Sequence, residues 1–163
     1  MFVESRRLQY EAKDPAAAER VLRRLLARDL DPTQRAVALT EMGIMQRNRG
    51  DQAASEKTLG DIVRERGMTD QVGAGAAYQL IWTTWSRDRR DALGVADALA
   101  RDASDEGTRL YARWAAAMLA AELGDTVRAR ADYRALVADC GDREAFQGIV
   151  KDVRSRLDRL DGR

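Results

Sequence analysis

Cys140 is the side chain in this sequence that is most readily made into a nucleophile, and it is the only cysteine among 163 residues. A reactive cysteine needs a neighbouring base or a positive field that stabilises the thiolate. Its neighbours Asp139 and Asp142 are acidic, so their charges oppose thiolate formation. The sequence therefore predicts an unreactive thiol near the end of a helix. A single cysteine also leaves no partner for an intrachain disulfide.

The chain contains no histidine, which excludes histidine-based catalytic triads, histidine-ligated zinc and histidine general bases. Clustered carboxylates could still act as an acid and a base if burial raised one pKa. Two clusters exist, comprising Asp102, Asp105 and Glu106, and Asp139, Asp142 and Glu144. Both fall at predicted helix ends, where carboxylates cap backbone N–H groups. We therefore predict a protein that is not an enzyme and that holds no cofactor and no metal ion.

Glycine-rich and arginine-rich stretches could contact phosphate groups. The string GAGAA at 73–77 follows no predicted strand and matches neither the dinucleotide-binding nor the P-loop spacing, so a close helix crossing explains it better. The pairs Arg23-Arg24 and Arg89-Arg90 lie beside acidic residues, as Glu19 lies four before Arg23. With 28 basic and 27 acidic residues, the chain lacks the basic excess of a nucleic-acid binder. An RNA-binding helical repeat is kept only as a less favoured alternative.

Length and composition predict one all-helical domain. The chain is 45% hydrophobic and 34% charged, it is rich in alanine, and it has only two prolines. No apolar run approaches the length of a membrane span, and charged residues from Glu4 onward do not fit a signal peptide. We expect a cytoplasmic protein. A periplasmic or membrane-anchored location is the alternative if a further segment precedes Met1 in the natural chain.

Four aspartates divide the chain at intervals of 37 residues, and each lies in a polar break between helix-like segments: Asp14, Asp51, Asp88 and Asp125. Four positions after each aspartate comes a small residue: Ala18, Ser55, Ala92 and Ala129. Eight positions after come Leu22, Leu59, Ala96 and Tyr133, and eleven after come Leu25, Ile62, Leu99 and Leu136. These spacings describe one face of a helix. The small residue would let this helix approach its predecessor closely.

This pattern resembles the tetratricopeptide repeat, a helix-turn-helix unit of about 34 residues. The residues that carry the resemblance are Leu39, Met42-Gly43, Gly50-Asp51, Ser55 and Leu59, and then Gly124-Asp125, Ala129 and Tyr133. The period here is 37, and the first and third units lack the turn glycine. The resemblance implies a right-handed α-solenoid of four antiparallel helix pairs, with units at about 1–31, 32–67, 68–103 and 104–140. Other antiparallel helical stacks remain the alternative.

Capping signals give the expected helix boundaries. A first helix is expected at about 2–12, and Asp-Pro pairs at 14–15 and 31–32 should open the second and third helices. Later helices should follow Asp51, Asp70 and Asp105. Asp142 should cap a terminal amphipathic helix within 142–161, which would cover the end of the stack. No equivalent cap precedes the first unit, so exposed Phe2 and Leu8 could make the chain a homo-oligomer.

The resemblance also implies that the first helix of each pair lines a groove. The positions that it selects are Arg7, Tyr10 and Glu11; Glu41, Ile44, Arg47 and Asn48; Tyr78, Ile81 and Trp85; and Tyr111, Trp114, Met118 and Glu122. Interfaces favour aromatic residues and methionine, so these positions predict a protein- or peptide-binding scaffold with aromatic anchors. A self-associating structural module is the alternative. The aromatic side chains could instead fill the core, which is where Trp82 is assigned.

Overall fold

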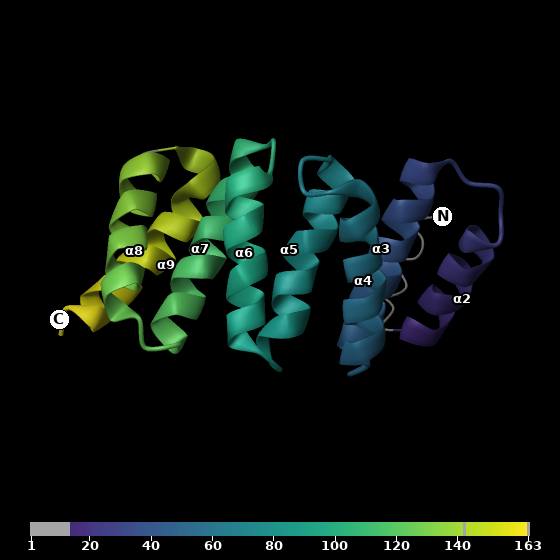
Figure 1. The fold of residues 1–163 in the computed structure, drawn as a ribbon, viewed down its shortest axis with the longest axis horizontal. Coiled ribbons are helices and arrows are strands. Elements are labelled where there is room, and N and C mark those ends of the chain that lie inside the picture. Colours follow the sequence, from purple (N-terminus) through teal and green to yellow (C-terminus); the bar gives the residue numbers. More distant parts are fainter. Residues whose placement is uncertain (1–13, 142, 163) are drawn as a thin grey trace.

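The chain is all-helical over the residues that the computed structural model describes, which are 14–141 and 143–162. Eight α-helices and one 3-10 turn are described, and no strand occurs among these residues. Their bounds are α2 Pro15–Leu26, α3 Pro32–Asn48, α4 Gln52–Arg66, α5 Gln71–Trp85, α6 Arg89–Asp102, α7 Glu106–Glu122, α8 Thr126–Cys140, η1 Glu144–Phe146 and α9 Gln147–Leu160. Figure 1 shows α2 to α8 following the chain order along the long axis of the molecule, while α9 turns back and appears between α7 and α8 in this view. The helix expected at 2–12, together with Phe2 and Leu8, lies outside the described residues.

An aspartate opens every helix from α2 to α8. In each case the carboxylate accepts a hydrogen bond from a backbone N–H two or three residues later, as Asp14 does from Ala17 at 2.8 Å. The seven capping residues are Asp14, Asp31, Asp51, Asp70, Asp88, Asp105 and Asp125. These bonds satisfy N–H groups that have no partner inside the helix. The helix starts predicted from the aspartates are therefore confirmed.

The terminal helix starts differently. α9 begins at Gln147, after the 3-10 turn Glu144–Phe146, and no side chain caps its first turn. The backbone N–H of Phe146 bonds to the carbonyl oxygen of Arg143 at 3.0 Å, so the chain satisfies its own groups through the tighter turn. The terminal helix therefore starts at Gln147 and not directly after Asp142 as predicted, and Asp142 itself lies outside the described residues.

The second helices α2, α4, α6 and α8 bury the face that the aspartate spacing predicted. The residues four, eight and eleven positions after Asp14, Asp51, Asp88 and Asp125 are all at most 5% exposed: Ala18, Leu22, Leu25, Ser55, Leu59, Ile62, Ala92, Ala96, Leu99, Ala129, Tyr133 and Leu136. The hydroxyl of Ser55 donates to the backbone oxygen of Gly43 at 2.7 Å, which brings α4 against the backbone of α3. The close approach expected at the small residue is confirmed there.

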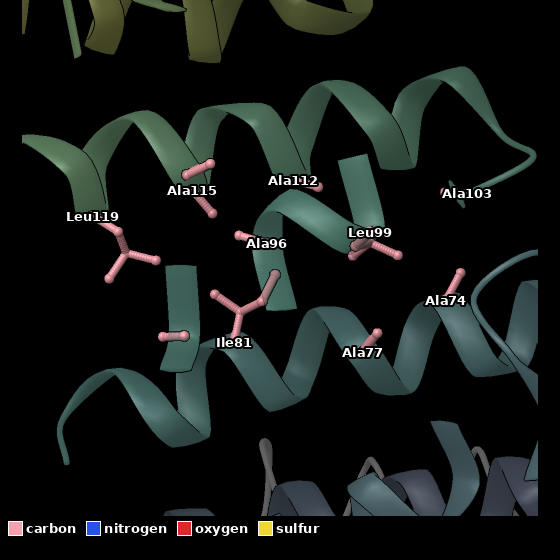
Figure 2. Packing of buried hydrophobic residues seen from close by; sticks show 11 residues of the cluster. Ala74, Ala77, Ile81, Ala96, Leu99, Ala103, Ala112, Ala115 and Leu119 are labelled. Atoms are coloured by element: carbon pink, nitrogen blue, oxygen red, sulfur yellow. The ribbon is translucent and has the colours of Figure 1, made fainter. Parts of the chain in front are cut away.

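Successive helices pack against one another, and alternate helices from α3 to α9 also make contact. α3 contacts α5, α5 contacts α7 and α7 contacts α9, in addition to the contacts between successive helices. Figure 2 shows the centre of this packing, where α6 lies between α5 and α7. The cluster is rich in alanine: Ala74, Ala77, Ile81, Ala96, Leu99, Ala112, Ala115 and Leu119. Such small side chains allow the helix backbones to come close together.

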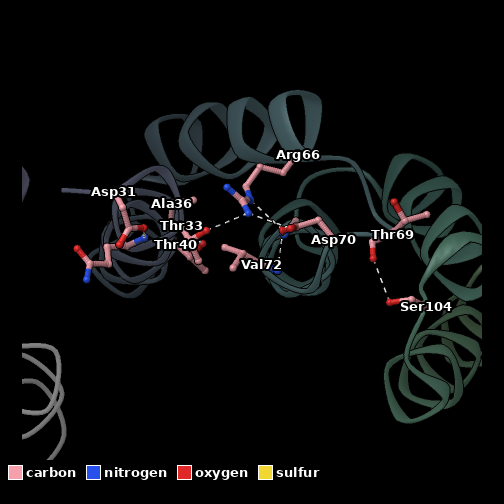
Figure 3. Close-up of polar contacts among 11 residues, drawn as sticks. Asp31, Thr33, Ala36, Thr40, Arg66, Thr69, Asp70, Val72 and Ser104 are labelled. Carbon is pink, nitrogen blue, oxygen red and sulfur yellow. Dashed lines mark hydrogen bonds and ion pairs between the residues drawn. The ribbon is translucent and has the colours of Figure 1, made fainter.

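A polar cluster holds the turn between α4 and α5 (Figure 3). The guanidinium group of Arg66 donates two hydrogen bonds to the carboxylate of Asp70, at 2.8 and 2.9 Å, and a third to the hydroxyl of Thr33 at 3.3 Å. Asp70 also accepts from the backbone N–H groups of Val72 and Gly73. One carboxylate therefore joins the end of α4 to the start of α5, and Arg66 ties both to α3.

Acid should weaken this junction. The hydrogen bonds from Arg66, and next those from the Gly73 N–H, hold the pKa of Asp70 far below its ordinary value. A carboxyl whose pKa is lower in the folded state stabilises the fold fully above the unfolded pKa of about 3.9, and this stability is lost as the pH falls below it. We expect the free energy of unfolding to fall less steeply in Asp70→Asn than in wild type between about pH 5 and pH 2.

Urea unfolding at a series of pH values measures this slope. Asp29→Asn, a change at an exposed aspartate in the α2–α3 turn, is the control and should keep the wild-type slope. Equal slopes for wild type and Asp70→Asn would show that Asp70 does not couple folding to acid.

Candidate functional site

The expected groove residues divide into three groups. Arg7, Tyr10 and Glu11 lie outside the described residues. Ile81 is fully buried in the α5–α6–α7 core, and Met118 is 5% exposed and packs toward α8 and α9. Both side chains belong to core clusters and line neither pocket of the first helices, so their assignment to the groove was wrong. The remaining positions lie at or near the surface of the first helices, except for Glu41, which is buried but lines a pocket.

Six aromatic rings form a continuous strip along α5, α7 and η1. Tyr78 and Trp82 meet edge to face with ring centroids 5.8 Å apart, and Trp82 stacks on Trp85 at 4.9 Å. Across to α7, Trp82 lies 6.0 Å from Trp114 and Tyr78 lies 6.2 Å from Tyr111. Such contacts add to the stability that burial of the rings provides.

Trp82 joins three of these rings, although the sequence pattern assigned it to the core. It is only partly buried, and it contacts aromatic residues on its own helix and on α7. The spacing Tyr78, Trp82 and Trp85 (i, i+4, i+7) places all three on one helical face. That spacing was the signal that could have identified Trp82.

The indole N–H groups of two tryptophans form hydrogen bonds within the chain. The indole N–H of Trp85 donates to Glu122 of α7 at 2.8 Å, and that of Trp114 donates to Asp152 of α9 at 2.8 Å. Each carboxylate also accepts from an arginine, Arg89 in the first case and Arg156 in the second. These tryptophans therefore connect consecutive first helices, and their N–H groups are engaged.

Two adjacent pockets open on the N-terminal halves of the first helices. One, of 190 Å³, lies between α5 and α7 and is lined by Gly75, Tyr78, Thr108 and Tyr111. The other, of 200 Å³, lies between α3 and α5 and is lined by Val37, Thr40, Glu41, Gln71, Val72 and Gly75. We call the two together the first-helix groove.

Gly75 lies on the floor of both pockets. It is exposed, and a Cβ atom built there would meet no other atom within 4 Å. Because Gly75 has no side chain, no side-chain atoms separate the two pockets at this position of α5. Tyr111 is 39% exposed, which is high for an aromatic side chain, and it forms the far wall. Burial raises the pKa of Tyr78, which forms the near wall, so this hydroxyl stays protonated.

The polar residues expected to bind peptide lie elsewhere. Arg47 donates to the backbone oxygen of Gln79 at 3.3 Å and so links α3 to α5. Asn48 is exposed but is the last residue of α3, away from the pockets near its middle. Ile44 is half-buried, and Glu122 is bound by Trp85 and Arg89. Of the polar groove residues that were expected and are described, Glu41 alone lines a pocket.

The far end of the strip is formed by the turn before α9. The ring of Phe146 lies 6.2 Å from that of Tyr111, and the Arg143 guanidinium lies 4.9 Å above the Phe146 ring. Arg143 also donates to Glu106 at 3.0 Å. A cation held over a ring in this way fixes the ring's position. Phe146 was expected only as part of the cap, and its contact with Tyr111 brings it to the edge of the groove.

Cys140 does not have the environment of a reactive thiol. Burial raises the pKa of the Cys140 thiol, which is the opposite of the shift that a nucleophile needs. Over residues 14–141 and 143–162, no group of three or more metal-ligating side chains is placed to hold an ion. The aspartates at the helix starts accept backbone hydrogen bonds instead.

A scan against models of known protein families, a search of curated proteins and a search of solved structures each returned no match to this chain. What the chain binds is therefore inferred from its own residues and contacts. In the part of the chain that the structure describes, no helix has both the length and the apolar composition that a bilayer crossing requires.

Proposed function

We propose that this chain is a non-catalytic protein-binding scaffold, built as a right-handed solenoid of helix pairs similar to tetratricopeptide repeats. Two observations support the architecture. The same positions after Asp14, Asp51, Asp88 and Asp125 are buried in four different helices, at a spacing of 37 residues. The first helices also contact one another in the order α3, α5, α7 and α9, as expected for stacked pairs.

The observation that carries the function is the open floor of the first-helix groove at Gly75. Two pockets share this residue, and the aromatic side chains Tyr78 and Tyr111 stand beside it. Gly75 is exposed, and a Cβ atom there would meet no atom within 4 Å, so α5 places no side chain between the two pockets at this position. Tyrosines bury a large area and lose little conformational freedom on binding, so they are common anchors at protein interfaces. An extended segment of a partner protein would lie across α3, α5 and α7.

Binding to nucleic acid is disfavoured by the same surface. The one charged side chain that lines the groove is the acid Glu41, which would repel a phosphate backbone. The neighbouring arginine Arg66 is already held by Asp70 and Thr33. The adaptor function is therefore favoured over RNA binding.

Filling the groove at Gly75 should weaken binding and leave the fold intact. We expect Gly75→Gln to weaken the binding of groove-specific peptides at least about tenfold, because a long neutral side chain would obstruct the groove at the residue that both pockets share. Gly94→Gln is the matched control: Gly94 is also an exposed helical glycine where a Cβ atom would meet nothing within 4 Å, but it lies on α6. Both changes replace glycine with a better helix former, so neither should lower stability.

Peptides for this test come from a displayed random 12-residue library selected on the wild-type protein. Their dissociation constants are then measured by fluorescence anisotropy with wild type, Gly75→Gln and Gly94→Gln. The proposal requires peptides whose affinity falls with the change at Gly75 and is unchanged with the change at Gly94. If no selected peptide depends on Gly75, the groove is not the binding site.

A further inference from the structure

The two halves of the first-helix groove differ in chemistry. The pocket between α5 and α7 is walled by the rings of Tyr78 and Tyr111 and has no charged lining residue. The pocket between α3 and α5 contains Glu41, beside Thr40 and Gln71. The groove therefore presents an aromatic surface next to a carboxyl group, with Gly75 between them.

A second carboxylate, that of Asp105, lies at the border of the groove, near the basic side chain of Arg109. Asp105, which caps α7, accepts hydrogen bonds from the backbone N–H and the hydroxyl of Thr108, at 2.7 and 2.8 Å. Those bonds, with the one from the Thr108 N–H first, lower the pKa of Asp105 and keep it ionised. On the opposite side Arg66 is paired with Asp70, so its charge is balanced. A partner that brings positive charge fits this surface better than an acidic one.

The distance between the pockets limits how a partner can fill both. They lie on either side of α5, so their separation is about the 8–10 Å that divides packed helices. An extended chain in the polyproline II conformation advances about 3.1 Å for each residue and completes one turn in three residues. Side chains three positions apart therefore point to the same side, about 9 Å from each other, and two such side chains could enter the two pockets.

We infer that the groove binds an extended protein segment in which a lysine or arginine and a large apolar or aromatic residue are three positions apart. The basic side chain contacts Glu41, and the apolar side chain lies against Tyr78 and Tyr111. This inference rests on the function proposed above and adds the composition of the partner. A carboxylate can accept several hydrogen bonds, so Glu41 can receive this donor beside the contacts it already makes within the chain.

Substitutions at Gln71 test the charge preference at an exposed position. Gln71 lines the Glu41 pocket and is the first residue of α5. For peptides selected as above, we expect Gln71→Lys to weaken binding about twofold to fivefold, and Gln71→Glu to tighten it by a similar factor. Ala53→Lys and Ala53→Glu are the controls, since Ala53 is exposed in the first turn of α4 and lines neither pocket. They should leave binding unchanged.

Glu41→Gln tests the acid directly. It keeps the side-chain shape, and it should weaken the same peptides about tenfold because a charge-assisted hydrogen bond is lost. Thermal unfolding of each variant shows whether the fold is retained. If Glu41→Gln unfolds, the two Gln71 variants decide the question.

The composition of the selected peptides distinguishes a wrong partner composition from a wrong adaptor function. Enrichment of a basic and an apolar residue three positions apart, with binding that depends on Gly75, supports the inference. Peptides that depend on Gly75 but are acidic or neutral overturn the inference and leave the adaptor function standing. Peptides that are insensitive to Gly75→Gln overturn both.

Discussion

Gly73→Ala is expected to destabilise the protein by about 3 kcal/mol, although alanine is the better helix former. A Cβ atom at Gly73 would lie 1.9 Å from the backbone oxygen of Gly67 and 3.0 Å from its carbonyl carbon. Gly67 ends α4 with φ of 72°, a conformation that few other residues adopt. The obstacle is therefore backbone within a constrained turn, and α5 must move away from α4 to accommodate the methyl group.

A matched substitution two residues later should have the opposite effect. Gly75→Ala places the same methyl group on the same helix, where it meets no atom within 4 Å, and it should stabilise the protein by about 0.5–1 kcal/mol. Urea unfolding followed by circular dichroism measures both free energies. If Gly73→Ala were as stable as wild type, the backbone of the α4–α5 turn at Gly67 would not obstruct a methyl group at position 73.

Trp114→Ala is expected to cost about 3 kcal/mol and to loosen α9 more than any other helix. The half-buried ring packs against Trp82, and its N–H donates to Asp152 on α9 at 2.8 Å. Burial acts to raise the pKa of Asp152, but the hydrogen bonds from Arg156 and Trp114 outweigh it and the pKa is lowered. Removal of Trp114 takes away one of these donors and much of the apolar contact.

Hydrogen exchange of the amides in 147–160, together with urea unfolding, tests this expectation. Trp114→Phe keeps most of the ring area and loses the N–H donor, so it should cost only about 1 kcal/mol. Val127→Ala is the control, because Val127 is 78% exposed and its truncation should change stability by less than about 0.5 kcal/mol. Unchanged exchange in α9 for Trp114→Ala would mean that this tryptophan does not hold the helix.

The role of Trp114 changes how binding should be tested. The sequence made Trp85 and Trp114 the expected anchors for a partner, and truncation of both would then be a direct test. Both indole N–H groups instead bind carboxylates on the next first helix, at Glu122 and Asp152. Loss of binding after such truncation would not distinguish a lost anchor from a loosened fold. Substitutions on the groove floor at Gly75 avoid this difficulty.

Local signals in the sequence were sufficient for most helix starts and failed at one. The aspartate caps depend on hydrogen bonds that span three residues, so neighbouring residues contain the required information. α9 follows a 3-10 turn that contacts α7 through Phe146 and Tyr111, and its start depends on that distant contact.

The glycines of GAGAA were expected to allow a close helix crossing. Gly73 is required by the turn at Gly67, and Gly75 opens the groove.

The sequence by itself determined the all-helical class, the aspartate-capped helix starts and the buried face of the second helices. These features follow from short-range hydrogen bonding and from one hydrophobic period that recurs every 37 residues. Only the tertiary structure decided which side chains of the first helices reach the groove. Successive helical residues point about 100° apart, so a shift of one position separates buried Ile81 from half-buried Trp82. Which face is covered depends on the neighbouring helices, whose contacts no local pattern encodes.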